Sequence, residues 1–180
     1  MEADWEFEIG GDAPVIEGYW SGFVDLRAYP ERTVELSECR ELWGLSEALI
    51  KLNAPQSSFW TSKTDVFTPE RVDPDEMNAS MDETVYTVAC YIDLLPSGDQ
   101  RWDSPFKAEQ VCKRFCAGLR ASVLRCCRVD VVVRNAVVAD VNDLGATVYF
   151  TACGSTQADA KNRLGESLAA FTEVVVSLGA

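Results

Sequence analysis

The feature that most constrains the fold is the succession of strand-like and helix-like hydrophobic patterns between residues 84 and 177. A half-buried strand alternates apolar and polar residues, whereas an amphipathic helix repeats its apolar residues every three or four positions. The block reads as strand, helix, strand, strand and helix, over residues 84–95, 105–125, 128–139, 145–153 and a last segment after Thr156. This order is typical of a ferredoxin-like split β-α-β unit. We therefore expect an α+β fold, with a mainly antiparallel sheet and helices on one face.

Local signals mark the ends of these elements. Ser104 before Pro105 is typical of a helix start. On the helix that follows, apolar residues that include Val123 fill one arc, and basic residues fill the opposite arc. Asn142 and Asp143 predict the turn between the two consecutive strands.

Residues 1–67 carry a weaker version of the same pattern. They begin with an acidic tail, because residues 1–17 hold six acids and no base. Two strands, one helix and a third strand are predicted after it, at residues 15–27, 32–39, 45–53 and 58–67. The acidic, proline-containing segment 68–83 reads as a connection to the second half, residues 84–180.

A faint internal repeat links the two halves. Phe23–Leu26 matches Tyr91–Leu94, and Thr64–Phe67 matches Val129–Val132. The repeat predicts two similar halves within what we expect to be one compact domain.

Histidine is absent from all 180 residues. This absence excludes Ser-His-Asp and Cys-His nucleophiles and His-ligated zinc, and leaves carboxylate, lysine, tyrosine or thiolate chemistry. The seven cysteines show no CxxC spacing, so we expect reduced thiols with no metal and no cofactor. No stretch carries the signature of a known family, and no residue stands out as catalytic.

The charge of the chain limits the classes of partner that it can bind. The formal net charge is −13, although residues 104–128 hold six basic residues against one acid. We expect neither nucleic acid nor a membrane as partner, because both surfaces are anionic. The N-terminal residues lack a signal-peptide pattern and no apolar run is long enough to span a bilayer, so we expect a cytoplasmic protein.

Aspartates beside aromatic residues are the first candidates for a binding site. Alternation places Asp25 with Phe23 on one strand face, and Asp93 with Tyr91 on another. Such pairs on an open sheet face could bind a polar ligand, and close carboxylates could exchange protons. The candidate ligand-binding residues are Phe23, Asp25, Trp60, Lys63, Asp65, Tyr91, Asp93 and Asp130.

The basic face of the 105–125 helix is a further candidate. Lys107, Lys113, Arg114 and Arg120 could accept a phosphate or an acidic partner, or could neutralise the acidic tail.

The leading functional hypothesis is a non-enzymatic binding or interaction module that forms a homodimer. It rests on the missing catalytic motifs and on aromatic residues expected on the open sheet face, namely Tyr19, Phe23, Tyr91 and Tyr149. One alternative is a small-molecule enzyme that uses carboxylates and lysine. Another is an acidic inhibitor or immunity-type partner of a basic protein, whose complex would weaken with salt.

Overall fold

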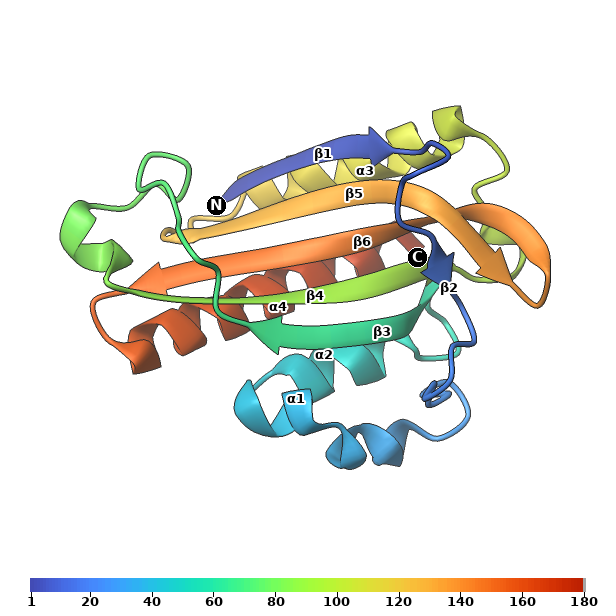
Figure 1. Cartoon of the computed structure of the whole chain (residues 1–180), viewed down its shortest axis with the longest axis horizontal. Helices are drawn as coiled ribbons and strands as arrows, with labels where there is room; N and C mark the ends of the chain where they lie inside the picture. The colour runs from blue at the N-terminus through green and yellow to red at the C-terminus, as the bar shows by residue number, and fades with distance from the viewer. Residues whose placement is uncertain (180) are drawn as a thin grey trace.

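A computed structural model of the chain describes residues 1–179 and shows an α+β fold on a mixed, six-stranded sheet (Figure 1). The strand order is β1-β5-β6-β4-β3, and β2 pairs with the C-terminal part of β5. The strands are β1 (Glu2–Glu8), β2 (Ile16–Glu17), β3 (Phe59–Phe67), β4 (Tyr86–Pro96), β5 (Cys127–Val138) and β6 (Val141–Gly154). The α+β prediction is confirmed. The sheet is mixed, because β1 and β2 run parallel to β5 while the other pairs are antiparallel.

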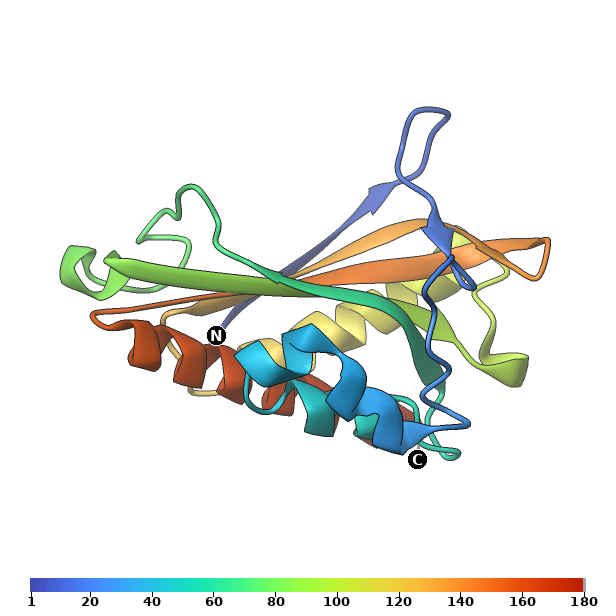
Figure 2. The ribbon, with the colours of Figure 1, turned by 60° about the horizontal axis from the view of Figure 1, so that its bottom comes forward.

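The longer helices cover one face of the sheet, as Figure 2 shows from below. They are α2 (Leu45–Leu52), α3 (Pro105–Arg120) and α4 (Gln157–Gly179). The shorter helices are η1 (Pro30–Glu35), α1 (Ser37–Glu41), η2 (Met81–Thr84) and η3 (Gly98–Gln100). The main core lies between helices and sheet and takes residues from both halves of the chain, for example Leu49 of α2, Phe115 of α3 and Phe171 of α4.

The first strand comes from the segment that the sequence marked as an acidic tail. Ala3, Trp5 and Phe7 alternate with acids and pack against the main core beside α3. The Arg120 guanidinium of α3 donates a hydrogen bond to the Ala3 carbonyl oxygen at 2.8 Å and lies 3.6 Å from Asp4. The tail prediction is wrong because these acids form the wet side of a half-buried strand.

The strand predicted over residues 15–27 is also wrong. Only Ile16–Glu17 pairs with a neighbouring strand, and the rest forms turns. This segment is tied instead to β3, where the Trp20 indole N–H donates to the Ser62 carbonyl oxygen at 3.3 Å. Because Phe23–Leu26 is not a strand, its match with β4 does not extend to the structure.

Of the other predictions for the first half, one is wrong and two are confirmed. Residues 32–39 form parts of η1 and α1 rather than a strand, and Pro30 stands at the first helical position of η1. The helix predicted at 45–53 and the strand predicted at 58–67 are confirmed as α2 and β3.

Two boundaries in the second half differ from the predicted ones. The β5–β6 turn lies at Ala139 and Asp140, both with positive φ, so Asn142–Asp143 belongs to β6. Two successive residues with positive φ suit the right-handed twist of a two-residue hairpin. Helix α3 ends at Arg120, which leaves Val123 outside the helix and 94% exposed rather than on an apolar helix face.

Substituting Phe115 tests the core. Phe115 is fully buried and its ring contacts those of Phe59 and Phe171. We expect Phe115→Ala to lower the free energy of unfolding by about 3–5 kcal/mol, measured by urea denaturation, because the cavity stays largely unfilled. The matched control Phe106→Ala, on the exposed side of the same helix, should change it by at most about 0.5 kcal/mol. Equal losses in the two variants would contradict this view of the core.

Candidate functional site

The sheet face opposite the helices is covered only at its two ends. At one end the segment 14–24 builds a small apolar cluster of Ile16, Trp60, Leu95 and Ala136, with Phe23 packed against it. At the other end the segment 68–80 brings Met77 against Cys126 and Cys153. Both segments lie on the side of the sheet away from the helices (Figures 1 and 2). The middle of this open face is left accessible between them.

Cross-strand register lines up polar side chains in the uncovered middle. Asp65 of β3 stands opposite Tyr91 of β4, Tyr91 opposite Tyr149 of β6, and Tyr149 opposite Asp130 of β5. The rings of Tyr91 and Tyr149 are 5.9 Å apart. Residues directly opposite in a sheet share a face. One row across four strands therefore holds two neighbouring tyrosines with one carboxylate on each side of the pair.

The next row contains a series of hydrogen-bonded polar side chains that are partly buried. Asp93 stands opposite Thr147, whose hydroxyl donates to the Asp93 carboxylate at 2.7 Å. Arg134 donates to the Thr147 hydroxyl oxygen at 2.9 Å and to the Tyr149 hydroxyl oxygen at 3.1 Å. Its other nitrogens bind Glu8 of β1 at 2.9 Å and 2.5 Å. These hydrogen bonds therefore connect side chains across the sheet from β4 to β1.

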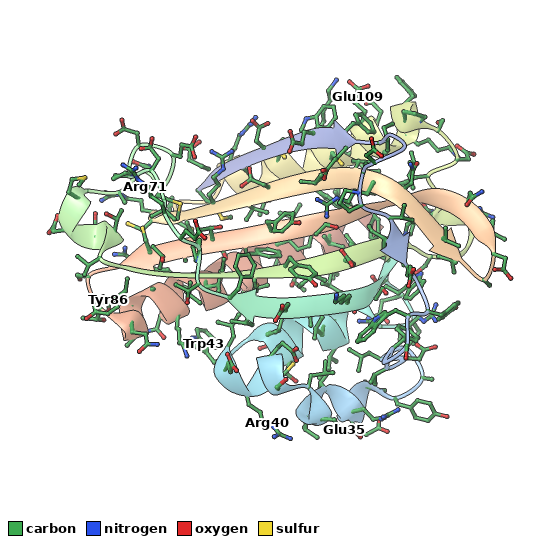
Figure 3. The ribbon with its side chains drawn as sticks, in the orientation of Figure 1. Glu35, Arg40, Trp43, Arg71, Tyr86 and Glu109 are labelled. Carbon is green, nitrogen blue, oxygen red and sulfur yellow. The ribbon has the colours of Figure 1, made fainter. Side chains whose placement is uncertain are left out.

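Several of these side chains line a hollow of about 650 Å³, which we call the open-face hollow. Its lining includes Lys63 of β3, Asp93, Arg134, Thr147 and the two tyrosines, with the segment 14–21 as one wall. Figure 3 shows this face toward the viewer. A volume of this size lies within the range of small-molecule sites in proteins.

The Asp93 carboxylate is disfavoured in its ionised form. Burial raises the pKa of Asp93, and the Thr147 hydrogen bond and the charges of Arg134 and Lys63 offset this only in part. Raised carboxyl pKa values in a hollow are typical of functional sites.

Lys63 stays a cation. The neighbouring Tyr91 hydroxyl, together with Asp93 and Asp65, raises the pKa of Lys63, while burial raises that of Tyr91. A lysine with a raised pKa carries its proton at neutral pH, so it can bind an anion but is a poor nucleophile or base.

A second depression of about 540 Å³ continues from the hollow toward β1. Asp130 lies in it and is held by Arg128 at 2.8 Å, while Arg134 and Tyr149 border both depressions. Asp4, Glu6 and Glu8 of β1 add further acids along this side.

Trp60, Phe23 and Asp25 lie apart from the hollow, in what we call the Trp60 cluster. The Arg27 guanidinium lies 4.1 Å from the centre of the Trp60 ring and forms an ion pair with Asp25 at 2.8 Å. The Arg27 hydrogen bond lowers the pKa of Asp25. Tyr19 stacks on Trp60 with ring centroids 5.5 Å apart. These groups satisfy one another and brace the covering segment.

The structure thus brings Lys63, Asp65, Tyr91, Asp93 and Asp130 to one face and leaves the other three candidates at its end. Sequence reasoning missed three polar residues of this face, Arg134, Thr147 and Glu8. Alternation along β5 and β6 puts Arg134 and Thr147 on the faces opposite Val133 and Val148.

The cysteine thiols are largely buried. Burial raises the pKa of Cys112 and Cys127 to about 12, and that of Cys39 to about 11, which keeps these thiols protonated. Among the described side chains, no three Cys, Asp or Glu residues are grouped so as to hold a metal ion.

The helices of residues 1–179 include none with the length and apolar character needed to span a membrane. Comparisons of the chain with models of protein families, with curated proteins and with solved structures found no match.

Proposed function

We propose that this chain is a binding module and that the open-face hollow holds a small polar ligand. The observation that carries the proposal is the placement of Asp93 and Lys63, two groups of opposite charge, around one hollow that the tyrosine rings of β4 and β6 also line. The covering segment at one end of the sheet, residues 14–21, forms a wall of the hollow.

The hydrogen-bonding and ion-pairing capacity that Asp93 and Lys63 leave unused indicates the chemical class of the ligand. Thr147 occupies one oxygen of Asp93, and no described residue donates to the other. The Lys63 ammonium lies 5.7 Å from the Trp20 ring and forms no ion pair with a described carboxylate. A ligand with an ammonium and a carboxylate would satisfy both, and the tyrosine rings would contact its apolar part. A small zwitterion such as a free amino acid fits this chemistry.

The two alternatives differ in support. An enzyme that relies on Lys63 as base or nucleophile is disfavoured by its retained proton. An acidic partner of a basic protein would use the depression beside β1, where Asp4, Glu6 and Glu8 outnumber the bases. Such a complex would weaken steeply with salt, whereas a ligand enclosed in the hollow would be less sensitive.

Self-association into a homodimer stays a prediction. Strand β1 is an edge of the sheet and carries Glu2, Asp4, Glu6 and Glu8. Acids on an edge strand oppose pairing with a second copy, because like charges would face each other. A dimer would therefore use another surface, and sedimentation velocity over a range of concentrations would detect it.

Ligand binding can be tested by NMR titration of the labelled protein with free amino acids and, for contrast, neutral monosaccharides. We expect saturable shifts of amides in β4 and β6 near Tyr91 and Tyr149, caused by amino acids and not by sugars. Asp93→Asn should weaken this binding by about tenfold or more, because a charged hydrogen bond is lost.

The matched control is Asp140→Asn in the β5–β6 turn, where asparagine suits the positive φ. It removes one carboxylate and leaves the hollow intact, so affinity should not change. Shifts that survive Asp93→Asn unaltered, or that map outside the hollow, would refute the proposed site.

The stability of the fold should report the state of Asp93. Its folded-state pKa is raised, so the stability that it contributes is full below the unfolded value near 3.8 and is lost as pH rises through the folded value. Asp93→Asn should therefore be more stable than the wild type at pH 7, and this advantage should shrink as pH falls. Thermal unfolding across this pH range measures it, and a variant less stable at pH 7 would contradict the expectation.

A further inference from the structure

A cleft on the helix side of the sheet has the opposite charge from the rest of the surface. It has a volume of about 290 Å³ and is lined by residues of α3, of η3 and the segment after it, of the beginning of β3 and of the end of α4. We call it the basic cleft, because the charged residues described in its lining are basic, namely Arg101, Lys107 and Arg114.

One stripe of α3 supplies most of the polar wall. Lys107, Gln110 and Arg114 recur every three or four residues, so they project from the same side of the helix. The opposite side of α3 buries Ala108, Cys112 and Phe115 in the core. The amphipathic pattern of this helix therefore fixes where its cations lie.

The three cations are not equally engaged. Arg101 forms an ion pair with Asp143 at 2.6 Å, and Lys107 forms one with Asp103 at 2.8 Å. Among the side chains that the structure describes, no carboxylate pairs with Arg114, although the chain has 29 acidic residues against 16 basic ones. Its neighbour Lys113 differs, because it is held by Glu109 at 2.6 Å.

The remaining walls are apolar and partly aromatic. Phe59 and Trp102 are almost fully buried, and Phe106 stands at the rim with 67% of its surface exposed. The Trp102 ring packs edge-on against Phe59 at 5.9 Å, and no described residue accepts a hydrogen bond from its indole N–H. The cleft thus combines flat apolar walls with a guanidinium that pairs with no carboxylate among the described side chains.

We infer that the basic cleft binds a small organic anion, in which a carboxylate or phosphate is joined to an apolar ring. The anion would be held by Arg114 with Lys107 and Gln110 beside it, and the ring would lie against Phe106 and Trp102. Guanidinium groups bind both kinds of anion through paired hydrogen bonds. The volume of the cleft suits a ligand of about one ring. This site is independent of the open-face hollow, which lies on the other face of the sheet.

The test titrates the intact protein with benzoate and with phenyl phosphate, followed by NMR. Inorganic phosphate and benzylamine are the comparison probes, one without the ring and one with the opposite charge. We expect saturable shifts in α3 and around Trp102 with benzoate or phenyl phosphate, weaker binding of inorganic phosphate and none of benzylamine. Binding should weaken as salt increases, because Arg114 and Lys107 are exposed.

Two variants of adjacent cations provide the control. Arg114→Gln should weaken binding by about tenfold or more, whereas Lys113→Gln should leave it unchanged. Both residues are exposed, so thermal unfolding should show both variants folded. The proposal is overturned if neither ring-bearing anion binds, or if both variants lose affinity equally. Inorganic phosphate bound as tightly as phenyl phosphate would overturn the apolar part of the ligand class.

Discussion

The inward orientation of Phe150 is the constraint on which both faces of the sheet depend. Phe150 in β6 and Phe115 in α3 both contact Phe171 of α4, with ring centroids 5.2 Å and 5.5 Å apart. Because side chains alternate along a strand, this packing places Thr147 and Tyr149 on the open face. A shift of β6 by one residue would bury their hydroxyl groups against α4 and remove the floor of the hollow. Packing in the core therefore determines which side chains of β6 face the open-face hollow.

The open-face hollow retains a carboxylate that packing alone would not favour. Burial opposes the ionised form of Asp93, and a single hydroxyl from Thr147 supplies its hydrogen bond. The nearest guanidinium, Arg134, is shared with Glu8, Thr147 and Tyr149. Groups kept at some expense of stability are typical of sites selected for binding or chemistry. Asp93 therefore differs from Asp25 and Asp130, each of which forms an ion pair with a guanidinium.

The sequence predicts the fold best where a strand or helix has its own strong periodicity. The elements between 86 and 179 were predictable because their apolar residues repeat over many positions. Strand β1 was not, since its only neighbour is β5, more than a hundred residues away, and its acids obscured the alternation of Ala3, Trp5 and Phe7. The covering segment 14–24 failed for a related reason. Its apolar residues pack on the sheet without pairing with it, and alternation alone cannot distinguish the two.

The candidate site was predictable in part for the same physical reason. Alternation gives the face of Tyr91 and Asp93 on their own strand, but the neighbours across the sheet depend on strand order, which the sequence does not encode locally. Arg134 and Thr147 join Asp93 only because β6 lies between β4 and β5.

Charge is distributed over this molecule by the same alternation that builds its core. Strand β3 contacts both sites, since Phe59 lines the basic cleft and Lys63, farther along, faces the open-face hollow. Helix α3 turns its cations away from the core, and β1 turns its acids toward the open face. A close-packed core separates the two sites, so a ligand at one has no steric path to the other. Each site can therefore be altered by substitution without disturbing the charges of its counterpart.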